Sequence, residues 1–324
     1  MTKLQKYLIA ILGLQIVLIL VVFLLQKPVA ASDNLIFPDL KIENVSEIHI
    51  SDSSGNVVSL QKKGNEWVLP LQDDYPVKEE TIQQLVDNLA LIRDNRLITR
   101  SESSHERLSI ADDNFIRKVE ITVNGKKSSL YFGSSPATSN IHFRLDGKAE
   151  VYLTNAINTS HISSAISSWV DTLIYQIPSN AAKSITVSNP QGEFVFEADA
   201  EGNWSANNLE EGFQFDQSKW SSLQTAFTTL RFLEPVTRTM QPEFGLDDPE
   251  TILKIEYTDE QENTINSELL IGNSDDVGNY FVKWSESDYV FKVSSYNAER
   301  ITNMTAEDYS SPVPTETPEA ETSN

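Results

Sequence analysis

The first thirty residues contain the longest apolar run in the chain. Residues 7–25 carry no charge, and fifteen of these nineteen residues are Leu, Ile, Val or Phe. A helix of this length spans about 29 Å, close to the hydrocarbon thickness of a bilayer. Lys3 and Lys6 precede the run, and basic flanks favour the cytoplasmic side. The pattern predicts a cytoplasmic stub at residues 1–6 and a single-pass transmembrane anchor at residues 7–25 in the cell membrane, with the C-terminal bulk extracytoplasmic.

A cleaved signal peptide is the alternative interpretation of the same segment. Val29, Ala30 and Ala31 are small enough for a cleavage site. The apolar run is longer than the 7–15 residues usual in a signal peptide, which favours a retained anchor. Under both interpretations residues 26–41 form a linker and the rest of the chain is exported.

Beyond the linker, the hydrophobic pattern occurs twice. Three residues recur after a shift of 137 positions: Ile48, Gly55 and Trp67 return as Ile185, Gly192 and Trp204. Apolar residues alternate with polar ones on both sides of each glycine. Such alternation predicts strands joined by tight turns.

An amphipathic helix follows the strands in each copy. The apolar positions have spacings of i, i+3, i+7 and i+10: Ile82, Leu85, Leu89 and Ile92 in the first copy, and Trp220, Leu223, Phe227 and Leu230 in the second. This spacing places all four side chains on one helix face. Asp216 stands just before the second stripe, where it is expected to cap the helix N-terminus.

The remainder of each copy predicts two hairpins and a closing helix. The hairpins are expected at residues 118–133 and 141–154, and again at 253–272 and 280–293. Ile162, Ile166 and Trp169 have the spacing of one helix face, with a weaker counterpart at residues 301–308.

The pattern therefore predicts an α+β fold of two tandem repeats, each mainly antiparallel sheet with one or two helices. The repeats are expected at residues 42–177 and 178–308, joined near Ile177 and Pro178. Whether this joint is rigid or a hinge stays open. Residues 309–324 are rich in Pro, Thr, Glu and Ser, which predicts a disordered acidic tail.

Composition narrows the function. The 324 residues carry a formal charge of −22 and contain no cysteine. Binding of a phosphate backbone needs clustered Lys and Arg, so a nucleic-acid partner is excluded. The lack of cysteine excludes disulfides and thiolate metal sites.

No catalytic, cofactor-binding or metal-binding residue is predicted. The four histidines, His49, His105, His142 and His161, lack metal-ligand spacing. His49 lies between Ile48 and Ile50, so its side chain is expected to face solvent. Four adjacent carboxylate pairs lie in predicted loops: Asp73-Asp74, Asp112-Asp113, Asp247-Asp248 and Asp275-Asp276. Residues 273–279 are interpreted as a solvated turn, with a weak calcium site as the alternative.

The tryptophans offer one further candidate. Trp67 and Trp204 occupy equivalent positions in the two copies, which favours a shared role in the core. Trp284, near Tyr280 and Tyr289, is the better candidate for a ligand-binding surface.

Several short motifs carry a family resemblance. In order they are Gly202-Asn203-Trp204, Phe244-Gly245-Leu246-Asp247-Asp248-Pro249, Leu270-Ile271-Gly272 and Tyr280-Phe281-Val282. The chain resembles the bacterial, membrane-anchored family catalogued as domain of unknown function four-three-four-zero, best over residues 183–297. In the first copy Glu106-Arg107-Leu108 stands where the family shows an aromatic residue, Gly and Leu. Relatives are encoded beside gliding-type or exporter-type ABC transporter components. The resemblance therefore implies an accessory envelope protein, with possible ABC transporter subunits as partners.

Three functions follow as hypotheses. The first is a non-enzymatic accessory or scaffold component of an envelope or ABC-transporter-type complex. The second is an extracytoplasmic module that binds a polysaccharide or a peptide in a cleft between the repeats. The third is a hydrolase whose carboxylates and histidines converge from distant segments.

Overall fold

The computed structural model describes residues 3–25, 33–207 and 209–314. The expected cleavage site at residues 29–31, residues 26–32 of the expected linker and the last ten residues of the expected tail lie outside this part. Helix α1 comprises Lys3–Leu25 and exposes apolar side chains such as Leu12 and Ile19. Within the described ranges, no helix is long and apolar enough to span a membrane.

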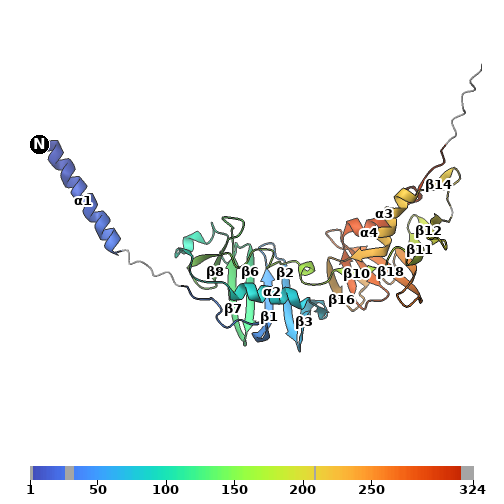
Figure 1. The fold of residues 1–324 in the computed structure, drawn as a ribbon, viewed down its shortest axis with the longest axis horizontal. Coiled ribbons are helices and arrows are strands. Elements are labelled where there is room, and N and C mark those ends of the chain that lie inside the picture. The colour runs from blue at the N-terminus through green and yellow to red at the C-terminus, as the bar shows by residue number, and fades with distance from the viewer. Residues whose placement is uncertain (1–2, 26–32, 208, 315–324) are drawn as a thin grey trace, which may run out of the picture.

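Two antiparallel sheets make up the body of the molecule (Figure 1). The first sheet contains β1 (Val45–Ser51), β2 (Val57–Lys63), β3 (Glu66–Leu69), β4 (Tyr75–Pro76), β5 (Leu97–Thr99), β6 (Arg117–Val123), β7 (Lys126–Phe132), β8 (Ile141–Leu145) and β9 (Val151–Thr154). The second contains β11 (Ala182–Asn189), β12 (Gly192–Ala198), β13 (Trp204–Ala206), β16 (Glu234–Thr237), β17 (Thr251–Thr258), β18 (Thr264–Ser274), β19 (Tyr280–Trp284) and β20 (Val290–Val293). With the few helices, this arrangement confirms the α+β class.

The strand orders of the two sheets correspond. The first runs β4-β3-β2-β1-β6-β7-β8-β9-β5, and the second runs β13-β12-β11-β17-β18-β19-β20-β16. A register shift lies between Val45 and Glu47 in β1, and another between Ala182 and Ser184 in β11. These two irregularities are 137 positions apart, like the sequence matches.

Two short ribbons lie outside these sheets. Strand β10 (Leu173–Gln176) pairs with β15 (Thr229–Arg231), and β14 (Phe213–Phe215) pairs with β21 (Ser310–Pro312). The first ribbon precedes the expected joint at Ile177 and ties this segment to β15, which is not a strand of the second sheet. The second ribbon corrects the expected disorder at residues 310–312, because pairing with β14 orders that stretch.

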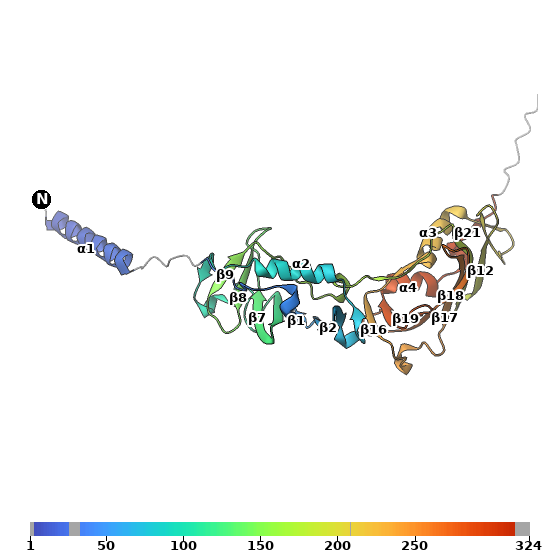
Figure 2. The same ribbon diagram turned by 60° about the horizontal axis from the view of Figure 1, so that its bottom comes forward.

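Each sheet buries one face beneath helices. Helices α2 (Glu79–Ala90), α3 (Gln217–Thr228) and α4 (Ser295–Thr302) lie on the same side of the two sheets (Figure 2). All eight apolar side chains of the two stripes are at least 92% buried. The last position of each stripe follows the helix: Ile92 lies beyond α2, and Leu230 lies in β15. Burial contributes roughly 1.5–3 kcal/mol for each such side chain, and one hydrophobic cluster is continuous through both sheets.

The helix starts follow local chemistry. Asp216 caps α3 as expected, since its Oδ1 accepts hydrogen bonds from the backbone N–H groups of Ser218 and Lys219 at 3.0 and 3.3 Å. The closing helix of the first copy is absent as an α-helix: only a 3-10 turn, Ile166–Ser168, forms there. In the second copy α4 starts at Ser295 and is followed by a 3-10 turn, Ala306–Asp308.

Two glycines make the same kind of close contact, one in each half of the chain. A Cβ at Gly133 would lie 2.1 Å from the Leu108 carbonyl oxygen, and a Cβ at Gly272 would lie 2.0 Å from the Phe244 carbonyl oxygen. Ser109 and Gly245 have positive φ angles of 54° and 66°. The counterpart of Phe244-Gly245-Leu246 is therefore Leu108-Ser109-Ile110, two positions later than the expected Glu106-Arg107-Leu108.

Replacing Gly133 or Gly272 with Ala should destabilise the protein by about 3 kcal/mol, because the new methyl group meets a backbone carbonyl that cannot rotate away. Gly64→Ala is the control: it has a φ of 63° but nothing within 4 Å, so only about 1 kcal/mol of backbone strain is expected. Urea unfolding followed by tryptophan fluorescence measures all three. An equal loss in the three variants would refute the assigned close contact.

Candidate functional site at the joint between the sheets

The two sheets meet through their edges. Strand β4 ends the order of the first sheet, and β16 ends the order of the second. Asp73, just before β4, accepts hydrogen bonds from the Thr237 hydroxyl and from the Arg238 backbone N–H, the latter at 2.7 Å. The Tyr289 hydroxyl donates to the Asp73 carbonyl oxygen at 3.1 Å. Asp73, in the loop between β3 and β4, thus accepts hydrogen bonds from polar groups at the edge of the second sheet.

Aromatic side chains fill the space beside this contact. The Tyr75 ring meets Phe232, Tyr289 and Phe291 edge to face, with ring centroids 5.6, 4.8 and 6.1 Å apart. Edge-to-face pairs contribute about 0.5–1.5 kcal/mol each beyond area burial. Burial raises the pKa of Tyr75 to about 12, with the negative charge of Asp171 adding to the shift. Its hydroxyl therefore stays neutral.

A cavity of about 590 Å³ opens on one side of the joint. Its walls are Tyr75, residues 173–178, residues 257–260, Trp284, Glu286, Ser287 and Phe291. Tyr175 and Trp284 stack within the wall, with ring centroids 4.2 Å apart. The volume falls within the range of small-ligand pockets, and the first sheet, the second sheet and the segment between them all contribute to the wall.

The charge around the joint is uneven. Residues 178–308 contain 24 Asp and Glu but eight Lys and Arg, whereas residues 42–177 contain 18 and 13. The cavity lining includes Asp259, Glu260 and Glu286 and no Lys, Arg or His. The site therefore presents a negative potential.

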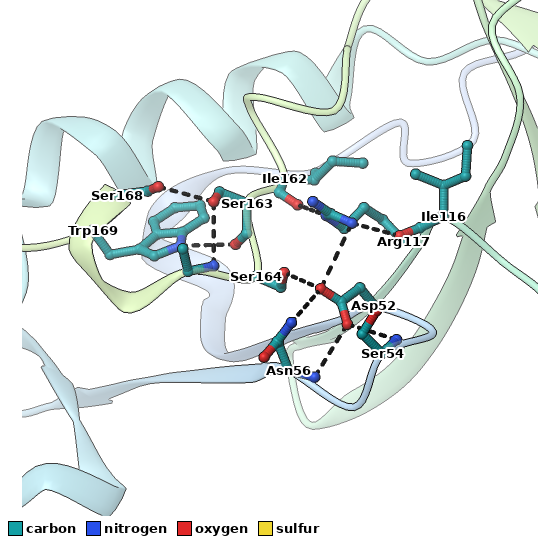
Figure 3. Close-up of polar contacts among 11 residues, drawn as sticks. Asp52, Ser54, Asn56, Ile116, Arg117, Ile162, Ser163, Ser164, Ser168 and Trp169 are labelled. Atoms are coloured by element: carbon teal, nitrogen blue, oxygen red, sulfur yellow. Dashed lines mark hydrogen bonds and ion pairs between the residues drawn. The ribbon is translucent and has the colours of Figure 1, made fainter. Parts of the chain in front are cut away.

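A second polar cluster surrounds Asp52 in the turn between β1 and β2 (Figure 3). Its carboxylate accepts hydrogen bonds from the Ser164 hydroxyl at 2.7 Å and from the Asn56 side chain at 2.9 Å. Arg117 lies 3.9 Å from the same carboxylate and donates to the Ile162 carbonyl oxygen at 3.1 Å. Burial raises the pKa of Asp52, but the hydrogen bonds from Asn56, Ser164 and Ser54 outweigh it and hold the pKa below 3.8.

The equivalent position in the second copy performs the same task. Asn189 lies 137 positions after Asp52, and its amide donates to the carbonyl oxygens of Ile301 and Met304 at 2.9 and 3.0 Å. In each half of the chain a polar side chain at the end of the strand, Asp52 just after β1 and Asn189 at the end of β11, bonds a segment more than 100 residues later. The Asp52 cluster is therefore a structural connection.

Four hairpin loops share a pattern that hydrophobic periodicity does not reveal. An Asp and an Asn four positions apart enclose each loop: Asp52 and Asn56, Asp199 and Asn203, Asp259 and Asn263, and Asp275 and Asn279. In each, one carboxylate oxygen accepts the N–H groups two and four residues later, and the fourth residue has a positive φ. The Asp-x-x-x-Asn spacing, with Gly in three of the four loops, is the signal that could have found these turns.

These bonds lower the pKa of the carboxyl groups. The Asn263 side chain and backbone hold the pKa of Asp259 below 3.8, and Asn203 does the same for Asp199. For Asp275, burial raises the pKa, but the N–H groups of Asn279 and Val277 and the nearby Lys292 together lower it. Each of these groups stabilises the fold when it is ionised.

The histidines lie in separate neighbourhoods. The His49 side chain is 29% exposed on the face of β1 opposite Ile48 and contacts Ser59 and Glu47. His105 contacts the Ala149 carbonyl oxygen, and buried His142 contacts that of Ser134. His161 is half-buried and accepts a weak bond from the Asn158 N–H.

The carboxylate pairs likewise lie in four different loops. Asp74 pairs with Lys63, Asp112 with Arg144, and Asp275 with Lys292 at 3.4 Å, whereas Asp247 and Asp248 are exposed. In the part of the chain that the structure describes, no group of three His, Asp or Glu side chains is arranged to hold a metal ion.

Of the two predictions for the tryptophans, one is confirmed and the other is wrong. Trp67 and Trp204 are buried, with 2% and 7% exposure, in accord with a core role. Trp284 is 97% buried, so its assignment to an exposed surface is wrong. Tyr175, which comes from β10, covers its ring.

The family assignment rests on more than half of the chain. The family described as Domain of unknown function (DUF4340) matches residues 67–243. The chain belongs to this family. The match starts at Trp67, passes through the joint and ends at Glu243, earlier in the chain than the expected range of 183–297. No curated protein and no solved structure matches the chain.

Acid should destabilise the protein through the loop aspartates. Their folded pKa values lie below the ordinary 3.8, so their contribution is present above about pH 4 and is lost as the pH falls through the folded values. Asp259→Asn should lower the free energy of unfolding at pH 7 and flatten its decline between pH 5 and 3. The exposed Asp276→Asn is the control, measured by urea unfolding. Equal pH slopes for wild type and Asp259→Asn would contradict the expectation.

Breaking the contact at Asp73 should loosen the two sheets. Asp73→Gly tolerates the φ of 49° but removes both side-chain hydrogen bonds. Asp74→Gly, with a φ of 61°, is the matched control. Because the chain lacks cysteine, spin labels can be placed at Lys126→Cys and Glu197→Cys. The distance distribution from electron paramagnetic resonance should broaden only for Asp73→Gly, and an unchanged width would show that Asp73 does not hold the joint.

Proposed function

We propose that the chain is a non-enzymatic, membrane-anchored extracytoplasmic protein that acts as an accessory or scaffold component of an envelope or ABC-transporter-type complex. The observation that carries the proposal is the uncharged apolar run at residues 7–25, followed by a large acidic body. A segment with fifteen Leu, Ile, Val or Phe residues gains several kcal/mol on entering lipid, about 0.3–0.6 kcal/mol for each. The exposed apolar side chains of α1 support this role.

The proposed organisation follows from the same features. Residues 7–25 anchor the chain with the N-terminus in the cytoplasm, and two duplicated α+β units follow as domains. The matching strand orders, the equivalent register shifts and the paired glycines support a duplication. The hydrogen bonds and aromatic contacts at Asp73 and Tyr75 support a single elongated body rather than a free hinge. Such a body suits a scaffold.

Ligand binding is the second candidate function, and the cavity at the joint favours it. The cavity takes its walls from the first sheet, the second sheet and the segment between them, as expected for a cleft between repeats. The hydrolase hypothesis has less support, because the adjacent carboxylate pairs lie in separate loops. Glycosidases instead bring two carboxyl groups to about 5–10 Å across a sugar.

Crosslinking in native membranes tests the proposed function. The full-length protein, crosslinked and then purified by affinity, should recover the same envelope or transporter subunits in replicate preparations. A variant with residues 7–25 deleted is the control and should lose these partners together with the membrane fraction. Recovery of the full-length protein from the cytosol would contradict the proposal, as would the lack of any reproducible partner.

A further inference from the structure

The cavity beside the joint combines aromatic rings with acidic groups. Tyr75, Tyr175, Tyr257, Trp284 and Phe291 contribute the aromatic side chains; Tyr75 and Tyr257 are partly exposed, and the other three are buried. The faces of such rings carry partial negative charge and attract cations. The wall of the cavity therefore favours a ligand that is both flat or apolar and positively charged.

The acidic side chains of the cavity differ in the hydrogen bonds that they already accept within the protein. Asp259 accepts hydrogen bonds within its own loop, and Glu286 accepts one from the Tyr257 hydroxyl at 3.0 Å. Glu260 is exposed at the rim. Lys283 donates to the Ser287 carbonyl oxygen without lining the cavity. Glu260 is thus the carboxylate best placed to meet an incoming cation.

We propose that this cavity binds a basic side chain, most suitably arginine, from a segment of an exported partner polypeptide. The proposal rests on the accessory role above, since it gives the chemistry by which a partner would be recognised. A guanidinium is weakly hydrated, stacks on aromatic rings and donates several hydrogen bonds. It would match the aromatic rings and the Glu260 carboxylate at once.

The charge of the site argues against other ligands. An anionic segment would meet three carboxylates and no basic group in the lining. A volume of about 590 Å³ holds an arginine side chain with part of the adjoining backbone. A basic segment would also be attracted by the surplus of acidic residues over 178–308.

The test uses the full-length protein in nanodiscs of zwitterionic lipid. Saturation-transfer NMR would compare the blocked pentapeptide acetyl-Gly-Gly-Arg-Gly-Gly-amide with matched peptides that carry Gln or Glu at the centre. The arginine peptide should bind about tenfold more tightly than the glutamine peptide. The glutamate peptide should show no binding.

Two substitutions locate the binding. Glu260→Gln should weaken arginine-peptide binding about two- to fivefold, whereas Glu262→Gln, which removes the same charge from the same loop outside the cavity, should leave it unchanged.

Two results would overturn the proposal: equal binding of the arginine and glutamine peptides, or equal losses in the two glutamate variants. Equal losses would mean that only the general negative field attracts the peptide. Crosslinking from native membranes separates this inference from the proposed function. If wild type and Glu260→Gln recovered the same partners equally, the accessory role would stand and the role of the cavity in partner recognition would be rejected. If the arginine peptide bound but no partner were recovered, the cavity would stand as a binding site and the accessory role would be rejected.

Discussion

The open edge of a β-sheet is the constraint on which this architecture depends. An edge strand presents unpaired N–H and C=O groups, and proteins cover or distort such edges to avoid pairing with other chains. Here the loop before β4 reaches β16, where the Asp73 carboxylate accepts the Arg238 N–H. Tyr75 follows within two residues and packs among the rings of the second sheet. The hydrogen bonds of Asp73 and the burial of the Tyr75 ring thus act at the same place, and together they join the edges of the two sheets.

Periodicity predicted the parts of the fold that bury a regular face. The apolar stripes of α2 and α3 were visible because one face of each helix covers a sheet, and the Asp216 cap was visible because its chemistry is local. The prediction of a closing helix in the first copy was wrong for a physical reason. Ile162, Ile166 and Trp169 have helical spacing, but serine side chains in that stretch bond the backbone and Asp52 instead. Such side-chain bonds compete with helix formation.

The candidate site was less predictable, because its parts come from distant segments. Trp284 lies on the same strand face as Val282, but nothing near it in sequence shows that Tyr175 covers its ring. The short strands β4, β10 and β16 have two to four residues, too few for a pattern. The backbone conformation of Ser109 was also hidden, since serine gives no sign of a positive φ. The equivalence of Leu108 with Phe244 therefore emerged only from the close approach to Gly133 and Gly272.

The uneven charge of the two halves would affect how the molecule is oriented at a bilayer surface. The formal charge is −5 over residues 42–177 and −16 over residues 178–308. A bilayer leaflet with anionic headgroups repels acidic surfaces within about one Debye length, roughly 8 Å at physiological ionic strength. If the N-terminal segment is held in such a bilayer, the electrostatic torque lifts the more acidic half away from the headgroups. The molecule would then stand upright and carry its joint at a distance from the lipid.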